Sequence, residues 1–370
     1  MDSMVHKIAL SFLPGITADL VRHVAQSGLS LQDFFSLNMP ELAASLNMKE
    51  SSVLQNVVRQ EALFKARAEL EFITRHSIRY ISLLDDDYPL LLREIPDAPV
   101  GLFCLGKARL DSVPAVGVVG TRRCTAYGTS FCNSFVSDLA PYFKDALIVS
   151  GLAFGIDAAA HKAALDNGLT TVAVLAHGLD MIYPSANRSL AAKILEAGGA
   201  LISEYPSKTT PYQRNFLQRN RIVAGLCEAL VVVESEVRGG AMSTANQAFS
   251  YSREVFALPG RVSDVASSGC NALIAKNKAN IFISIADFMN VMNWNVPALG
   301  APAPKKSLFP ELEGAPAKVY AIILKAGSPL AIDSIHYQSG LSMPELMSAL
   351  TDLEFEGIVN KLPGARYELA

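Results

Sequence analysis

The chain has 370 residues, half of them hydrophobic and 18% charged, and its formal net charge is -3. This length predicts more than one domain, and so much apolar material excludes a wholly disordered chain. The near-neutral total neither supports nor excludes a nucleic-acid partner, because phosphate binding depends on local clusters of Lys and Arg.

The sequence indicates neither targeting nor metal binding. The apolar run before Pro14 spans only about six residues, too few for a signal peptide, and no run approaches the roughly 18 apolar residues of a membrane span. The five cysteines are scattered and form no CxxC pair, which argues against disulfides and zinc. We therefore expect a soluble, cytoplasmic protein with no cofactor and no metal.

The composition changes three times along the chain. Residues 1–70 carry helical patterns, which predicts a helical N-terminal domain, and residues 71–296 alternate short β-rich runs with helical patterns. Residues 297–316 contain five prolines and are predicted to be a linker, because proline stiffens an extended chain. Residues 317–370 are helical and then end in strand-like runs.

The middle part determines the fold class. Helical patterns separate its apolar, β-branched runs, which predicts a doubly wound α/β fold with a mostly parallel sheet covered on both faces. In such a sheet the ligand lies beyond the carboxyl ends of the strands. The five runs are Val116–Val119, Ala146–Val149, Thr171–Leu175, Ala200–Ser203 and Leu230–Val233.

The first of these strands leads into a candidate phosphate site, Gly120-Thr121-Arg122. Gly120 permits a tight turn, the following helix is expected to present free backbone N–H groups, and Arg122 adds a charged fork for phosphate. The alternative is a strand–helix turn that binds nothing.

The second strand ends in polar and flexible residues. Gly151 and Gly155 let the backbone approach a ligand, and Ser150 and Gly151 are candidate contacts. Asp157 is expected to cap the next helix, since an Asp side chain accepts from its unpaired N–H groups. His161 is expected to be a core histidine rather than a general base.

The third strand is followed by Asn187 and Arg188, which offer polar contacts near a helix start. His177 and Asp180 could be taken for an acid–base pair. We do not expect one, because no nucleophile or second base stands at a compatible strand end.

The most basic stretch, residues 214–221, contains three arginines and one aromatic residue. It fits a site for single-stranded nucleic acid, because Arg neutralises phosphate while an aromatic ring stacks on a base. The alternative is a helix with a solvated basic face and a core phenylalanine. The candidate contacts in this stretch are Arg214, Phe216, Arg219, Asn220 and Arg221.

A second glycine-rich turn, Gly239-Gly240, follows the last of the five runs. It could form a backbone anion site, with Ser243 and Thr244 as hydroxyl donors. Many nucleotide and sugar-phosphate sites share this pattern, so it does not separate one function from another.

The two ends of the chain carry weaker signals. Residues 13–24 resemble one helix–hairpin–helix unit. Residues 332–369 read as helix, turn, helix and β-wing, which indicates a winged helix. Its second helix has four acidic residues and no basic one, so a DNA major groove would repel it. We therefore interpret this domain as a protein-contact module.

Together these motifs resemble the DNA-processing-protein-A (Smf) family, in order and over nearly the whole chain. The chain has Thr121 where many members have Ser, and Ser185 where some have Lys, with Arg188 close by. The matching segments are Gly120–Arg122, Ser150–Asp157 with His161, His177–Asp180 with Tyr183, Pro184 and Asn187, Ser203–Pro206, Phe216 with Arg219–Arg221, Gly239–Ala245, Pro259-Gly260 and Gly269–Ile274.

The resemblance implies an extended Rossmann fold between a helical N-terminal domain, of helix–hairpin–helix or SAM-like type, and a winged-helix-like C-terminal domain. It implies a homodimer that binds single-stranded DNA in a positively charged pocket, protects incoming DNA and loads RecA onto it during natural transformation. Arg122 would contact phosphate, and residues 214–221 would hold the strand. Residues 269–274 and those that follow would be a dimer surface.

Two other functions share part of this sequence pattern. Rossmann-like nucleotide phosphoribohydrolases also use a Gly-Gly turn followed by Thr, but the Glu that they need is replaced here by Gln247. A winged-helix regulator of duplex DNA is disfavoured by the acidic second helix. The sequence therefore favours a binding protein over an enzyme.

Overall fold

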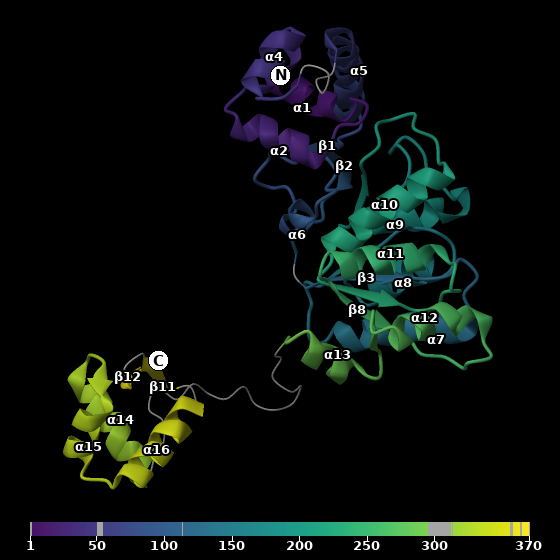
Figure 1. The fold of residues 1–370 in the computed structure, drawn as a ribbon. Coiled ribbons are helices and arrows are strands. Elements are labelled where there is room, and N and C mark those ends of the chain that lie inside the picture. Colours follow the sequence, from purple (N-terminus) through teal and green to yellow (C-terminus); the bar gives the residue numbers. More distant parts are fainter. Residues whose placement is uncertain are drawn as a thin grey trace. The chain divides into compact units, whose positions relative to one another are not determined.

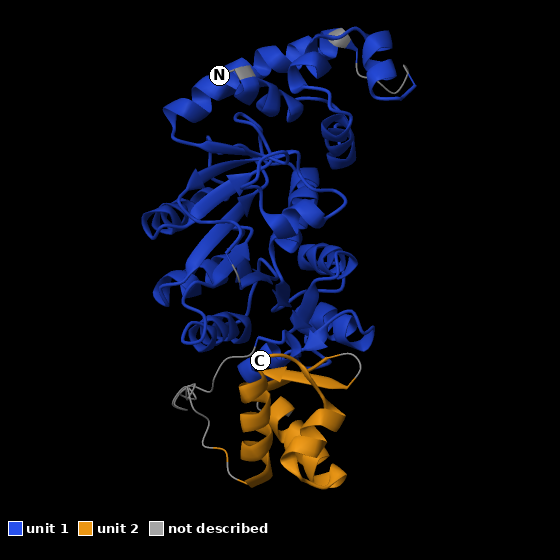
Figure 2. Ribbon diagram, turned by 90° about the vertical axis from the view of Figure 1, so that its left-hand side faces the viewer, with its two compact units in different colours: residues 1–296 blue, residues 297–370 orange. Residues whose placement is uncertain are grey.

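The computed structural model describes residues 2–49, 55–112, 114–294, 312, 314–355, 358–362 and 365–369. The chain divides into two compact units, residues 1–296 and 297–370 (Figure 2). The predicted linker, residues 297–316, lies almost wholly outside the described residues.

The first unit is built on a large sheet, and the predicted fold class is confirmed. Among the described residues, its strand order is β1-β2-β6-β5-β4-β3-β7-β8-β9 (Figure 1). Neighbours from β6 to β9 pair in parallel, whereas β2 pairs antiparallel with β6 and with β1. The strands are β1 (Arg79–Ser82), β2 (Gly101–Gly106), β3 (Ala115–Val119), β4 (Leu147–Ser150), β5 (Thr170–Leu175), β6 (Ala200–Ser203), β7 (Ala229–Val232), β8 (Glu254–Ala257) and β9 (Asn280–Ile281).

The central strands are apolar on both faces because helices cover both. In β3, Val116 and Val118 join the core on one face, while Ala115 and Val119 join the core on the other, as the two-residue period of a strand requires. The helices on the first face are α7 (Ala126–Leu139), α8 (Ile156–Asp166), α9 (Arg188–Glu196) and α13 (Ile285–Val291). Those on the second are α6 (Leu90–Glu94), α10 (Gln213–Leu226), α11 (Gly240–Ser250) and α12 (Ser268–Ala275).

Four strands of the sheet were not predicted. The strands β1, β8 and β9 have at most four residues, and β2 begins and ends in glycine. Unlike the equally short β4, β6 and β7, the strands β1, β8 and β9 begin with a charged or polar residue, so they do not stand out from loops as apolar runs. The strands β1 and β9 lie at the two edges of the sheet, where burial demands less of the sequence.

In the described part of residues 1–75 the chain forms five helices, of which α1 and α5 pack against the β1–β2 edge. Thr17 caps α2 by accepting from the Leu20 amide at 3.2 Å. Lys7 forms an ion pair with Asp85, and the hydroxyls of Ser11 and Tyr80 lie 2.7 Å apart. The helices are α1 (Asp2–Leu10), α2 (Ala18–Gln26), α3 (Leu31–Ser36), α4 (Met39–Ser45) and α5 (Asn56–Arg75).

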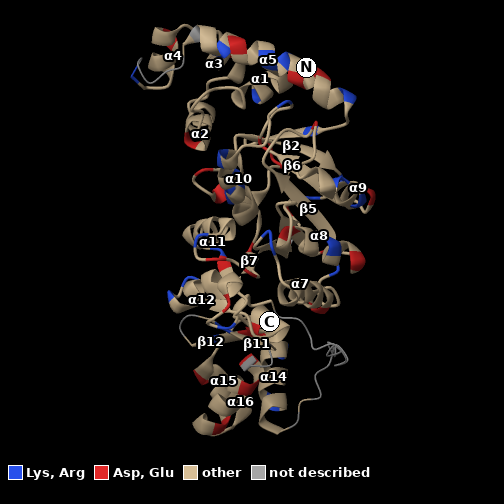
Figure 3. Ribbon diagram, turned by 90° about the vertical axis from the view of Figure 1, so that its right-hand side faces the viewer, with Lys and Arg blue, Asp and Glu red and all other residues tan. Residues whose placement is uncertain are grey.

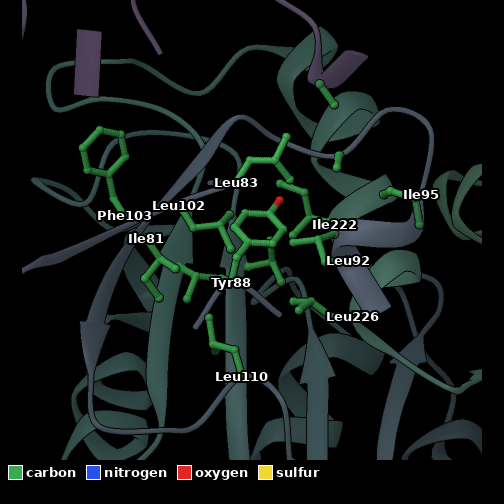
Figure 4. Close-up of a cluster of buried hydrophobic side chains, with 14 of the residues drawn as sticks. Ile81, Leu83, Tyr88, Leu92, Ile95, Leu102, Phe103, Leu110, Ile222 and Leu226 are labelled. Atoms are coloured by element: carbon green, nitrogen blue, oxygen red, sulfur yellow. The ribbon is translucent and has the colours of Figure 1, made fainter. Parts of the chain in front are cut away.

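A cluster around Tyr88 fixes α10 against α6 (Figure 4). Tyr88 is buried, and its hydroxyl donates to the Pro99 carbonyl at 2.7 Å. Leu92 of α6 packs in the same cluster as Ile222 and Leu226 of α10. One side of α10 is thereby held in the core, and its other side is available for a ligand.

The second unit is the predicted winged helix. It comprises α14 (Gly314–Ala326), α15 (Ile332–Ser339) and α16 (Met343–Phe355), with a sheet of order β10-β12-β11 formed by Leu330–Ala331, Arg366–Leu369 and Val359–Leu362. Leu346, Leu350 and Leu353 of α16 are buried in its core, as their spacing predicts. The Glu345 carboxylate accepts from the Ser342 amide at 2.9 Å and so helps to fix the start of α16.

Candidate nucleic-acid pocket

A pocket of about 660 Å³ opens at the carboxyl ends of β3, β4 and β7, beside α10. The chain winds from β3 towards β6 on one side and from β7 towards β9 on the other. The pocket therefore lies at the switch point of the sheet, where doubly wound folds bind ligands. Of the predicted site residues, it brings together Gly120, Thr121, Arg122, Gly151, Phe216, Arg219, Asn220, Gly239 and Gly240.

The loop after β3 carries Arg122 and is held by Glu234, a buried residue just beyond β7. The Thr121 amide donates to the Glu234 carbonyl at 2.6 Å, and the Thr125 amide donates to its carboxylate at 2.9 Å. Thr125 also caps α7 by accepting from the Gly128 amide at 3.3 Å. No residue of α7 lines the pocket, so Arg122 is the charged group that this loop brings to it.

The aromatic wall of the pocket is formed by Phe216 and Tyr183. Their ring centroids lie 5.8 Å apart, and the Arg122 guanidinium carbon lies 5.3 Å from the centroid of Phe216. Arg122 is exposed and Phe216 is half-buried, so neither is enclosed in the core. The structure thus brings a basic and an aromatic side chain together from different segments of the chain, Arg122 after β3 and Phe216 in α10.

Arg219, in contrast, belongs to the framework. Its side chain is buried and donates to the carbonyls of Gly151 and Val174, the former at 2.8 Å. Gly151 leaves room for this guanidinium, because a Cβ at that position would lie 2.5 Å from it and Arg219 would have to move. Arg219 therefore ties α10 to the ends of β4 and β5, although its edge also lines the pocket.

The other two arginines of the basic stretch diverge. Arg221 forms a half-buried ion pair with Glu204 at the opposite side of α10 and does not line the pocket. Arg214 is exposed in the first turn of α10, outside the lining. Figure 3 shows the basic segments that α10 carries. The structure thus separates three cations that the sequence groups together.

The start of α11 forms the opposite wall. Gly239 occupies its N-cap position, where no side chain caps the helix. The Asn220 side-chain Nδ2 donates to the Gly240 carbonyl at 3.5 Å and joins α10 to this turn. Thr244, one helical turn further on, lines the pocket, whereas Ser243 does not. The first turn of α11 therefore faces the pocket with its backbone N–H groups, a suitable position for an anion.

Several predicted contacts have structural roles or lie outside the pocket. The Ser150 hydroxyl donates to the Val118 carbonyl at 2.6 Å, and Asn187 donates to the Leu152 carbonyl at 2.9 Å, which braces the loop after β4. Arg188 and Ser185 are exposed and do not line the pocket.

The two histidines near the strand ends are buried framework groups. His161 is buried, its Nδ1 lies 2.7 Å from the Thr171 hydroxyl, and burial lowers its pKa to about 3, as expected of a core histidine. His177 accepts from the Tyr183 amide at 3.2 Å, and burial lowers its pKa also. Asp180 accepts instead from the Lys208 amide at 2.9 Å, so His177 and Asp180 form no acid–base pair.

Asp157 lies in the first turn of α8 but does not cap it, which corrects that prediction. Gly155 occupies the N-cap position, and the Asp157 carboxylate accepts from the Ala153 amide at 3.3 Å. Burial raises the pKa of Asp157, and the charge of Arg219 opposes that rise. Among the described residues, no group of three or more His, Cys, Asp and Glu side chains is placed to hold a metal ion.

The sequence did not reveal all of the pocket wall. Tyr183 was visible in a motif but was not proposed as a contact, and Gln213 and Leu217 are added by α10. A helical period would have found part of this set, because Phe216, Arg219, Asn220 and Val223 recur at the spacing of one helix face.

Gln247, in place of the glutamate that a phosphoribohydrolase needs, does not line the pocket. No helix in the described part of the chain could cross a membrane.

Fold and pocket define a Rossmann-like α/β protein with a cationic and aromatic site at its switch point. Residues 79–293 match the model of the DNA recombination-mediator protein A family, and residues 302–365 match that of the DprA winged helix domain. The chain belongs to this family, as its motifs predict.

Known relatives agree with that assignment over most of the chain. Protein Smf from Synechocystis is 32% identical over 98% of this chain and 97% of its own. The solved DNA processing protein A from Streptococcus pneumoniae is 34% identical, with a TM-score of 0.64, and the match covers 78% of this chain and 97% of that one. The protein from Helicobacter pylori, solved for its single-stranded DNA binding mode, is 32% identical, with a TM-score of 0.52, over 58% of this chain and 96% of that one.

Proposed function

We propose that this chain binds single-stranded DNA, without sequence preference, in the pocket beyond β3, β4 and β7. The observation that carries the proposal is the contact of Arg122 with Phe216, 5.3 Å from guanidinium carbon to ring centroid. Together they supply a charge for a phosphate and a ring for a base. The binding mode of the Helicobacter pylori relative supports the same partner.

The aromatic wall favours a single strand over a duplex. A base in a duplex already has both faces stacked, so only an unpaired base can lie on Phe216 or Tyr183. Stacking tolerates every base, which gives affinity without sequence preference. The start of α11 offers a second anion site opposite Arg122, so that one nucleotide can be held by its base and its phosphate.

We propose binding without a chemical reaction. Gln247 cannot serve as a general base, and both ring nitrogens of His177 are already engaged by backbone groups. The predicted biological role, protecting incoming single strands and loading RecA onto them during natural transformation in the cytoplasm, belongs to this proposal.

We also propose a homodimer, with its face near the β9 edge. Cys270 and Leu273 of α12 pack into the chain's own core, so most of the predicted apolar run is not available to a partner. Residues further along the chain are available to a partner, since Ile281 is 45% exposed and Ile283 is 70% exposed. An open sheet edge with exposed apolar side chains is suited to pairing with a second copy.

The proposed function is tested by fluorescence anisotropy with a labelled oligothymidine over a salt series, with unlabelled duplex as competitor. We expect tight binding that weakens steeply with salt and resists the duplex. Equal competition by duplex, or no binding at low salt, would contradict the proposal. Assays of RecA loading would follow a positive result.

A further inference from the structure

The N-terminal helices reach the pocket through one buried carboxylate, Glu69 of α5. Glu69 is 5% exposed. One of its oxygens accepts from the Ser207 amide at 2.9 Å, and the other accepts from the Ser207 hydroxyl at 2.7 Å. Both oxygens of the Glu69 carboxylate therefore accept hydrogen bonds from Ser207, which lies in a loop far away in sequence.

That loop, residues 204–212, joins β6 to α10, and we call it the rim loop. Pro211 near its end lines the pocket, and so does Gln213, which begins α10. Between them Tyr212 is 68% exposed at the rim. The position of the rim loop therefore sets the position of one pocket wall.

The rim loop is also joined to the segment that carries Tyr183. The Lys208 amide donates to the Asp180 carboxylate at 2.9 Å, and the Gly178 amide donates to the Thr209 carbonyl at 3.0 Å. Gly178 is needed at this contact, because a Cβ there would lie 2.6 Å from the Pro206 carbonyl oxygen. The contacts form a continuous path from Glu69 through the rim loop to the aromatic wall.

From this path we propose that Glu69 is a positioning residue for single-strand binding, through which α5 sets the geometry of the pocket wall. The inference rests on the proposed function. Glu69 does not itself contact the strand, so it affects affinity without contributing a phosphate contact. Its loss should therefore weaken binding while the salt dependence of binding stays the same.

The test is Glu69→Gln, with Glu71→Gln, an exposed glutamate on the same helix, as the matched control. A Gln side chain removes the charge of the acceptor, and its amide nitrogen can contact the Ser207 hydroxyl only if that hydroxyl turns from donor to acceptor, so both contacts become weaker. We expect the Kd for oligothymidine to rise about three- to ten-fold, with an unchanged salt slope, and the control to bind as the wild type does. Ser207→Ala should weaken binding less, and the two changes together should not be additive.

Wild-type affinity in Glu69→Gln would overturn the proposal, as would a lower melting temperature with unchanged affinity. Hydrogen exchange of the rim loop in the free protein separates this result from a failure of the proposed function. If the wild type binds no single strand, the proposed function fails. Faster exchange at Ser207, Lys208 and Thr209 in Glu69→Gln would then still support the positioning role, and unchanged exchange would contradict it.

Discussion

At the scale of single residues, the pocket separates side chains that meet a ligand from side chains that hold the fold. Arg122 and Arg219 both lie within 6 Å of the Phe216 ring, yet Arg122 is exposed and Arg219 is buried against backbone carbonyls. A guanidinium that is already satisfied by the protein has little left for phosphate. We therefore propose phosphate binding for Arg122, whereas Arg219 has a framework role.

Arg122→Ala should weaken binding to oligothymidine and lower the steepness of its salt dependence by about one unit in the log–log slope, because one phosphate contact is lost. The measurement is anisotropy over a salt series. Arg188→Ala is the matched control, since Arg188 is also exposed near a helix start but lies outside the pocket. An unchanged slope in Arg122→Ala would remove its assignment to phosphate.

Phe216→Ala should reduce the free energy of binding by about 1–3 kcal/mol, the usual contribution of one stacked base. Phe216 is half-buried at the pocket wall, so its truncation should change the melting temperature little. Anisotropy and thermal melting of the same sample check this. A lower melting temperature with intact binding would show instead that the ring belongs to the core.

His161 should make the protein less stable in acid. Its pKa is about 3 in the fold and about 6.5 in the unfolded chain, so the unfolded state takes up the proton first as pH falls below 6.5. The free energy of unfolding should then fall by up to about 1.4 kcal/mol per pH unit between those values. Denaturant melts of His161→Leu should lack this part of the pH dependence, while His76→Gln, at an exposed histidine, should keep it. Parallel curves for wild type and His161→Leu would contradict the assignment.

At the scale of elements, five of the strands and the turns beyond them could be predicted from the sequence, but helix orientation could not. β-branched runs identify β3 to β7, and Gly120 and Gly239 mark the turns beyond β3 and β7. Which side of α10 meets the core depends on α6 and the Tyr88 cluster, which are distant in sequence. For that reason Arg221 was grouped with the ligand-binding residues although it pairs with Glu204.

The helix α16 gives a prediction of its own. Its exposed residues include Glu345, Asp352 and Glu354 (Figure 3), which a DNA groove would repel. Replacing Asp352 and Glu354 together by Lys should create weak, salt-sensitive duplex binding that the wild type lacks. A mobility shift with duplex probe at low salt measures this. Duplex binding by the wild type that the Lys variant does not exceed would contradict a protein-contact role.

At the scale of the whole molecule, the family, the fold and the winged helix could all be predicted, because each depends on a pattern that runs along the chain. The pocket wall could be predicted only in part. The rim loop contacts α5 through Ser207 and Glu69, and it contacts the segment that carries Tyr183 through Lys208 and Asp180. These residues are distant in sequence, so no local pattern predicts their contacts.

The proposed dimer face can be tested by introducing one charged side chain into it. Ile283→Lys places a charge on the exposed apolar edge and should shift the protein from dimer to monomer, because a buried unpaired charge is costly. Sedimentation velocity measures the change. Val57→Lys, at an isolated exposed valine on α5, should leave the dimer intact. Equal assembly of Ile283→Lys and wild type would place the face elsewhere.

The central claim, that a single strand occupies the pocket at Phe216, is tested most directly by a fluorescent side chain at that position. The chain has one tryptophan, Trp294, which packs against Phe143 and Phe288. Combining Trp294→Phe with Phe216→Trp leaves one reporter, in the pocket. We expect oligothymidine to quench its emission over the same concentration range in which anisotropy shows binding. Binding by anisotropy with no change in emission would contradict the account.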